Sequence, residues 1–378
     1  MKRGFLKNSK PAKTPANRTS TAGPPATTST PAPDPDEFQP MTRLRFGKVE
    51  PALRGYQALQ LLRQAVNGQT TDYSDNTVFV STLPPLYPNE TLASNPDSWT
   101  ECVFWGGDHK RTIVSTPGFP SPIPRPRQVL HRVAPSRFGM GVFATRNIAM
   151  DDLIVSERPL LMAPHVIPPL PLNFSPDFKP THAQIMEARM VQYEQYLDMA
   201  LERMFPENCA AFLALHNAHT EDGSGPIYGR VRTNNILALD EPGGDSSRAM
   251  IAVFKDISRI NHSCVPNAEY GKLDVASLSL QLHAIRDIKK GEEIFIAYCP
   301  PTMPTTKRQA KLEPYGFQCT CRVCSDPNSD AFVAKVKSLT SNPLAPTALI
   351  QAIYGDSAEW AVHLTEMAPE LGNFLNRR

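Results

Sequence analysis

The chain has 378 residues, of which 41% are hydrophobic and 20% charged, and its formal net charge is +2. This length predicts one large domain or two modest ones, and the near-neutral charge gives no argument for direct nucleic-acid binding. No apolar run approaches the roughly twenty residues of a transmembrane helix, which argues against a membrane protein. The seven cysteines are few and partly clustered, and no hydrophobic signal segment is evident, so we expect an intracellular protein of the nucleus or cytoplasm.

Residues 1–45 form a basic segment rich in Pro, Thr and Ser, which we expect to be disordered. Its few large apolar residues cannot offset the entropy cost of ordering the chain. The basic residues also fit a nuclear or mitochondrial address, but the scattered prolines disfavour the amphipathic helix of a transit peptide. Residues 46–126 follow as a loop-rich region of unknown role, with one amphipathic helical pattern at 56–65.

Residues 127–300 carry the periodicity and motifs of a folded domain. The run Arg137-Phe138-Gly139-Met140-Gly141 marks a tight turn before an apolar strand. It lacks the third glycine and the helix of a dinucleotide-binding fingerprint, so a Rossmann fold is not indicated. A helical insert is predicted at about 165–230, with its main apolar periodicity from His182 to Phe205. Asn234-Asn235 stand at its end.

Two polar motifs follow the insert. Asn261-His262-Ser263-Cys264-Val265-Pro266-Asn267 comes first, and Gly291–Tyr298 then predicts a turn followed by a short buried strand. A tyrosine at a strand end, such as Tyr298, is most often a core residue whose hydroxyl bonds a backbone group. Ser263 has no supporting base nearby, and no Ser-His-Asp set or carboxylate pair is evident. Hydrolytic chemistry is therefore not indicated.

A third motif is the cysteine cluster Cys319, Cys321 and Cys324. These residues are too close along the chain to pair comfortably as disulfides. Three thiolates on one tight loop suit a tetrahedral zinc ion that needs a fourth ligand, for which Cys264 is a candidate. The alternative is a reduced, metal-free cluster.

These three motifs, in this order, resemble the catalytic half of the SET-domain protein lysine methyltransferases. The cysteine spacing is most similar to the SET-and-MYND branch, although the MYND zinc finger and the longer helical-repeat tail have no counterpart in this sequence. The resemblance covers roughly residues 127–326. It implies a mainly β fold, a SET β-clip of small curved sheets at 127–300 with a helical insert. A zinc-bound post-SET loop at 301–326 and a short helical tail at 327–378 would complete the chain.

The resemblance also implies S-adenosylmethionine as methyl donor and Tyr298 as the catalytic residue beside its sulfonium methyl. The cofactor-binding residues that it implies are Phe138, Gly139, Met140, Gly141, Asn234, Asn261, His262, Tyr298 and Phe317. Asn235 is the alternative register for Asn234, and Phe317 is also explained as a core contact that anchors the cysteine loop. The implied zinc ligands are Cys264, Cys319, Cys321 and Cys324.

The expected activity is transfer of a methyl group to a lysine ε-amine of a protein substrate, histone or non-histone. Such a reaction needs orientation of the reactants and an apolar setting that keeps the amine neutral, which explains the lack of an acid–base constellation. The alternative is a catalytically silent SET module that binds a protein partner or chromatin. A zinc-centred interaction domain without cofactor is a third possibility. The substrate, the degree of methylation and the oligomeric state are not determined by these residues.

Overall fold

The computed structural model describes residues 71–87, 89–240, 248–339, 342, 345–355 and 358–367. The tail expected at 1–45 and the helical pattern at 56–65 lie outside these residues. Within them, no helix is long and apolar enough to cross a membrane.

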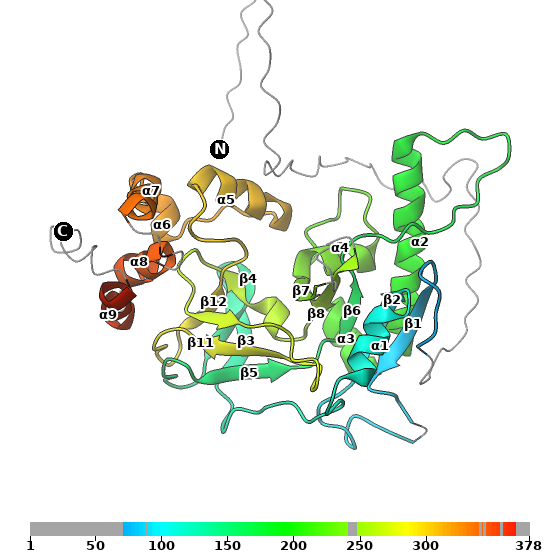
Figure 1. Cartoon of the computed structure of the whole chain (residues 1–378), viewed down its shortest axis with the longest axis horizontal. Coiled ribbons are helices and arrows are strands. Elements are labelled where there is room, and N and C mark those ends of the chain that lie inside the picture. The colour runs from blue at the N-terminus through cyan, green and yellow to red at the C-terminus, as the bar shows by residue number, and fades with distance from the viewer. Residues whose placement is uncertain are drawn as a thin grey trace, which may run out of the picture. The chain divides into compact units, whose positions relative to one another are not determined.

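The strands are β1 (Val78–Leu83), β2 (Thr100–Trp105), β3 (His131–Ser136), β4 (Gly139–Ala144), β5 (Leu153–Glu157), β6 (Leu161–Pro164), β7 (Ile236–Leu239), β8 (Met250–Val253), β9 (Asn261–His262), β10 (Ala268–Tyr270), β11 (Leu280–Ala284) and β12 (Glu293–Ile296). The helices are α1 (Asp108–Ser115), α2 (His182–Arg203), α3 (Pro206–Leu213), α4 (Pro226–Asn234), η2 (Ile257–Arg259), α5 (Thr305–Leu312), η3 (Glu313–Tyr315), α6 (Arg322–Ser325), α7 (Ser329–Leu339), α8 (Ala345–Tyr354) and α9 (Ala358–Met367). Figure 1 shows their arrangement.

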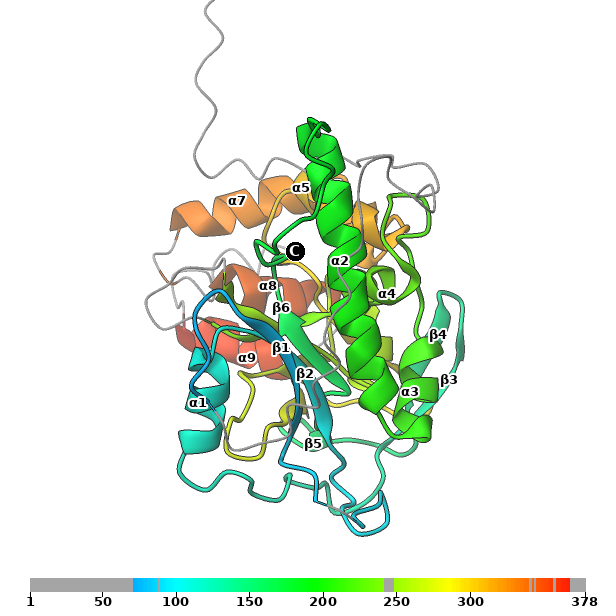
Figure 2. The ribbon, with the colours of Figure 1, turned by 90° about the vertical axis from the view of Figure 1, so that its right-hand side faces the viewer.

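A five-stranded sheet with the order β1-β2-β6-β8-β7 supports the helical insert. Its edge hairpin, β1 and β2, lies in the region that was expected to be loop-rich. Both strands are short apolar runs bounded by turn residues, which is the signal that could have revealed them. Helix α2 lies along this sheet (Figure 2), and its buried Tyr193 and Leu197 join one apolar cluster with residues of β6 and β8.

Helix α2 begins where its sequence provides a strong N-terminal signal. Thr181 is the N-cap residue, and its side chain accepts a hydrogen bond from the backbone of Gln184, whose own side chain bonds back to Thr181. This capping box satisfies two backbone N–H groups that a helix otherwise leaves unpaired. Helices α2, α3 and α4 lie between β6 and β7, as a helical insert requires.

Two smaller sheets, β10-β11-β5 and β3-β4-β12-β9, enclose the main core. Their inward side chains are aliphatic and buried, among them Val142, Ile154, Leu282 and Ile294. The expected core of small curved sheets is confirmed, with helices at the insert and at the C-terminal end.

The site is positioned by the crossing of two chain segments. Strand β9 pairs in parallel with β12, so that Phe295 lies opposite Asn261. Asn267 is fully buried, accepts a hydrogen bond from the backbone N–H of Phe295 at 2.7 Å, and donates to the carbonyl of Glu293 at 2.8 Å. This amide fixes the segment that carries the Asn-His-Ser-Cys motif against the strand that leads to Tyr298.

Candidate active site and metal centre

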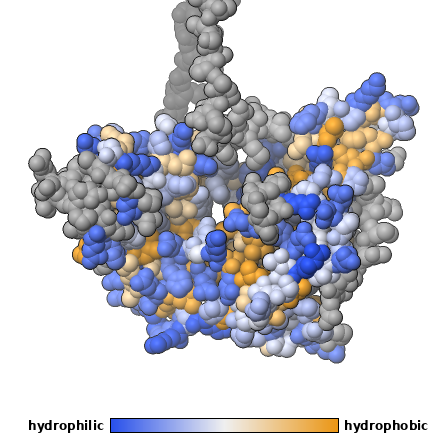
Figure 3. Space-filling model, viewed as in Figure 1, coloured by the Kyte–Doolittle hydropathy of each residue, from blue (hydrophilic) through white to orange (hydrophobic). Residues whose placement is uncertain are grey.

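A pocket of about 1480 Å³ lies where the crossing, the β3–β4 turn, the end of the insert and the cysteine loop meet. Eight of the nine predicted cofactor residues line this pocket: Phe138, Gly139, Met140, Asn234, Asn261, His262, Tyr298 and Phe317. Figure 3 shows hydrophobic residues gathered beside a hollow near the centre of the molecular face, over the region of β7 and β8 in Figure 1. The folded chain thus brings together residues that the sequence spreads over about 180 positions.

The ninth residue, Gly141, does not line the pocket and supports it from behind. A side chain on Gly141 would place its Cβ 2.4 Å from Oε1 of Glu293 and 3.0 Å from Nδ2 of Asn261. Gly139 has a φ of +105°, a conformation that favours glycine, and it does line the pocket. The two glycines therefore have different tasks: Gly139 makes the turn, and Gly141 leaves room for Asn261 and Glu293.

Glu293 was not singled out in the sequence, yet it holds the Asn261 amide in place. Nδ2 of Asn261 donates to Oε1 of Glu293 at 2.7 Å and to the carbonyl of Met140 at 3.2 Å. The hydroxyl of Ser136 donates to the other carboxylate oxygen at 2.9 Å. Both of these Asn261 hydrogen bonds are made by Nδ2. The Oδ1 atom of Asn261 is therefore left to accept a hydrogen bond from a bound group.

His262 connects the pocket to the cysteine cluster. Its Nδ1 accepts a hydrogen bond from the backbone N–H of Tyr298 at 2.9 Å, and its Nε2 lies 3.4 Å from Sγ of Cys264. Burial lowers the pKa of His262 to about 4, so the ring is neutral at physiological pH. Since Nδ1 is an acceptor, the proton of the neutral ring lies on Nε2 and points at the sulfur.

Tyr298 lies two residues after β12, among other aromatic rings. Its hydroxyl donates to the carbonyl of Ile260 at 2.7 Å. Burial, followed by the neighbouring Tyr315 and Tyr270, raises the pKa of Tyr298 well above its ordinary value, so the hydroxyl stays protonated. The ring centroid of Tyr315 lies 4.9 Å and that of Phe317 6.4 Å from the ring of Tyr298. Tyr315 was missed as a site residue, although it stands in the same Tyr-Gly-Phe motif as Phe317.

The two asparagines at the end of the insert are placed differently relative to the pocket. Asn234 lines the pocket and Asn235 does not. Nδ2 of Asn234 donates to the carbonyls of His216 and Arg230, at 2.7 Å each. The bond to His216 ties the end of α4 to the segment after α3, which also lines the pocket.

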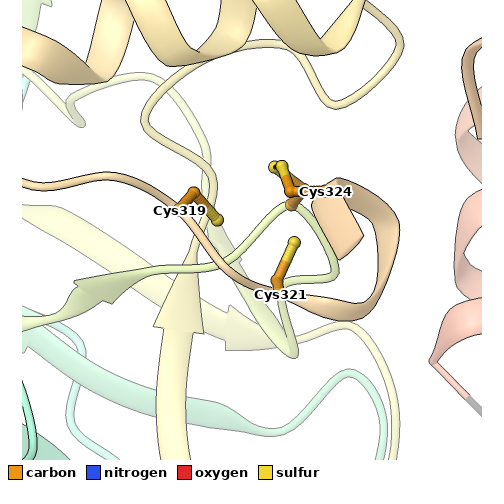
Figure 4. A group of neighbouring side chains, drawn as sticks. Cys319, Cys321 and Cys324 are labelled. Atoms are coloured by element: carbon orange, nitrogen blue, oxygen red, sulfur yellow. Dashed lines mark hydrogen bonds between the residues drawn. The ribbon is translucent and has the colours of Figure 1, made fainter. Parts of the chain in front are cut away.

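The four cysteines of the predicted metal set converge on one point. Their sulfur atoms all lie within 4.8 Å of one another, and Sγ of Cys264 is 3.6 Å from Sγ of Cys324. Tetrahedral coordination at about 2.3 Å per metal–sulfur bond separates neighbouring sulfurs by about 3.8 Å, whereas a disulfide needs about 2.05 Å. Figure 4 shows the side chains of Cys319, Cys321 and Cys324 turned toward this common point.

Two hydrogen-bond donors lie against the sulfurs. Besides the Nε2–H of His262 on Cys264, the guanidinium of Arg308 donates to Sγ of Cys324 at 3.4 Å. Neither donor can accept a hydrogen bond in return, so each sulfur is the acceptor. Hydrogen bonds among the four sulfurs lower the pKa values of Cys321 and Cys324 and raise those of Cys264 and Cys319. The donor set therefore fits a metal ion that prefers sulfur ligands.

Residues 139–299 match the family model described as the SET domain. This match covers less than half of the chain, and the sequence relatives are named lysine methyltransferases. The chain is 35% identical over 153 residues to the histone-lysine N-methyltransferase set5 of Schizosaccharomyces pombe, a match that covers 39% of this chain and 43% of that protein. It is 25% identical over 175 residues to the human N-lysine methyltransferase SMYD2, covering 45% of this chain and 39% of that protein.

This chain thus spans less than half the length of these curated relatives. Among solved structures, the Chaetomium thermophilum polycomb repressive complex 2 matches with 14% identity and a TM-score of 0.24, over 45% of this chain and 15% of that one. The predicted resemblance to SET-domain lysine methyltransferases is confirmed by the family model and the sequence relatives.

Proposed function

We propose that this protein is an S-adenosylmethionine-dependent protein-lysine N-methyltransferase. The SET domain and the names of its sequence relatives support this class of activity. The observation that carries the proposal is the placement of Tyr298 in one continuous pocket with Asn261, His262, Asn234 and Phe317. The proposed substrate is a protein that presents a lysine side chain, and the proposed location is inside the cell.

Each residue has a definite task in this proposal. S-adenosylmethionine supplies an electrophilic methyl group on a sulfonium. The Oδ1 atom of Asn261, oriented by Glu293, accepts from a polar group of the cofactor, and the ring of Phe317 offers an apolar face to its adenine. Tyr298 and Tyr315 shield the lysine amine from water, and this desolvation favours its neutral, nucleophilic form. The enzyme then acts mainly by aligning the amine with the methyl group.

We further propose that the four-cysteine cluster binds zinc in a structural role. Zinc takes four thiolates in a closed tetrahedral site and adds cross-links that a short loop cannot obtain from its own hydrophobic burial. Here it would join Cys264, beside the Asn-His pair, to the loop that carries Cys319 and Phe317. Two of the four cysteines, Cys319 and Cys321, also line the pocket. Metal binding would thereby shape the pocket wall.

The test separates an enzyme from a silent SET module. Zinc-loaded protein is titrated with S-adenosylmethionine by calorimetry and then supplied with radiolabelled cofactor and a cell lysate. We expect binding, and labelled lysine in protein bands whose identity mass spectrometry establishes. Tyr298→Phe should retain the fold and lose at least about tenfold in labelling, because the positioned hydroxyl is removed.

Tyr87→Phe is the matched control, because Tyr87 is 60% exposed and lies outside the pocket. This variant should label like the wild type. Cofactor binding without any labelling, in the wild type as in Tyr298→Phe, would favour the silent binding module. Absence of cofactor binding by folded, zinc-loaded protein would refute the enzyme.

A further inference from the structure

Arg308 on α5 is the largest side chain that is fully buried in the described part of the chain. A buried guanidinium is costly unless it is hydrogen-bonded and balanced by negative charge. Its Nη1 donates to the carbonyls of Pro301, at 3.1 Å, and of Met303. Its Nη2 donates to the hydroxyl of Thr305 at 2.8 Å and to Sγ of Cys324 at 3.4 Å. The carbonyls and the hydroxyl satisfy hydrogens but carry no charge.

The cysteine cluster offers the missing negative charge. Four thiolates around a divalent cation leave a net charge of about −2. Nη2 of Arg308 lies 3.4 Å from Sγ of Cys324, which places a cation in direct contact with a ligand sulfur. A buried anionic metal centre and a buried guanidinium each carry a desolvation cost. Their opposite charges offset this cost when the two lie side by side.

A carboxylate connects Arg308 to the C-terminal helices. Asp330, in the first turn of α7, lies 3.7 Å from Nη1 of Arg308. Its carboxylate also accepts from the backbone N–H of Thr305, at 2.9 and 3.0 Å, and so caps the start of α5. Val333 of α7 and Ile350 of α8 are buried in the same apolar cluster as the cysteines. Charge and apolar packing therefore join α7 to the cluster.

We propose that Arg308 is the counter-charge that allows the buried four-cysteine site to hold its metal, and that through Asp330 it couples metal binding to the docking of α7 on α5. Arg308 is thus a positioning residue of the metal site. The proposal depends on the metal site and is independent of methyl transfer. Its experiment needs neither cofactor nor substrate.

The first measurement is the zinc affinity of the full chain, by competition with a chromophoric chelator. Arg308→Met keeps the bulk of the side chain and removes the charge, and Arg308→Lys keeps the charge and removes the planar fork. Partners of metal ligands typically contribute 10- to 100-fold to metal affinity. We expect Arg308→Met to bind zinc 10- to 100-fold more weakly than the wild type, and Arg308→Lys to lie between them.

Lys335→Met is the matched control, because it removes one positive charge from an exposed position on α7. It should bind zinc like the wild type. Wild-type affinity in Arg308→Met, or equal loss in the Lys and Met variants, would overturn the proposal. If Arg308→Met does not fold, Arg308→Lys decides: affinity within tenfold of the wild type supports the counter-charge, and a larger loss rejects it.

The coupling is measured by hydrogen exchange with and without a chelator. In the wild type, zinc removal should speed exchange at residues 329–339 of α7, whereas α1 (108–115), which is remote in the sequence and absent from the cysteine cluster, should not respond. In Asp330→Asn, exchange of α7 should be fast even with zinc bound. Unchanged protection of α7 after zinc removal would refute the coupling.

Discussion

The backbone N–H of Tyr298 donates to Nδ1 of His262 at 2.9 Å. One imidazole ring thereby fixes the start of the segment after β12 and directs its other nitrogen at Cys264, 3.4 Å away. The proposed catalytic tyrosine and the proposed metal site are therefore linked by a single side chain. A substitution in the cysteine cluster should therefore affect the Tyr298 segment, and a substitution in that segment should affect the cluster.

His262→Ala should weaken both zinc binding and cofactor binding. It removes the donor to the Cys264 sulfur, and loss of such a partner lowers metal affinity by about 10- to 100-fold. It also leaves the N–H of Tyr298 without its acceptor. Chelator competition and calorimetry measure the two affinities. His165→Ala, at an exposed position, is the control. Normal affinity for both ligands in His262→Ala would contradict the linkage.

Cys264→Ser should reduce the affinity for S-adenosylmethionine, although Cys264 does not line the pocket. The substitution removes one thiolate of the cluster, and the loop that carries Phe317 and Cys319 then loses its anchor. Calorimetry should show weaker cofactor binding together with loss of zinc. Cys209→Ser, outside the cluster, should match the wild type. Zinc loss with unchanged cofactor affinity would show that the loop is held by packing alone.

Glu293→Gln should raise the KM for S-adenosylmethionine by about tenfold with little change in kcat. The carboxylate accepts from Asn261 at 2.7 Å and from Ser136 at 2.9 Å, and loss of its charge weakens both bonds by about 1–1.5 kcal/mol in total. An effect on binding alone leaves kcat unchanged. Steady-state kinetics with varied cofactor measures the two parameters. Glu269→Gln, exposed on β10, is the control. A fall in kcat at unchanged KM would place Glu293 in the chemical step instead.

Asp222→Asn should destabilise the protein at neutral pH and lose this effect in acid. Burial alone would raise the pKa of Asp222, but the hydrogen bond from His219 and the charge of Arg232 lower it well below its ordinary value. The native carboxylate therefore contributes stability that is complete above the unfolded-state pKa of about 4 and is lost as the pH falls through the lower folded-state pKa.

At pH 7 the loss in Asp222→Asn should be about 1–2 kcal/mol by denaturant titration. The difference from the wild type should shrink below pH 4, because the unfolded wild-type chain then binds a proton at Asp222 before the folded protein does. Asp177→Asn, at an exposed position, should cost little at any pH. A difference that stays constant down to the acid limit would mean that Asp222 acts through shape and not through charge.

The amino-acid sequence by itself determined the class of domain and singled out eight residues that line the pocket. The Asn-His-Ser-Cys motif, the short strand before Tyr298 and the Cys-x-Cys-x-x-Cys cluster are local patterns, and local patterns carry their own turn and ligand chemistry. The helical insert was likewise visible, because an amphipathic period and a capping box are contained within α2. The strands β1 and β2 were missed because short apolar runs among prolines resemble loops.

Only the tertiary structure decided which distant groups meet. The parallel pairing of β9 with β12 brings Cys264 to the cysteine loop and His262 to Tyr298, across 60 and 36 residues of sequence. The same crossing sets Glu293 against Asn261, and the docking of α5 buries Arg308 against Cys324. Glu293 and Arg308 are ordinary charged residues in the sequence. Burial beside a specific partner gives them their role, and burial is a property of the folded chain.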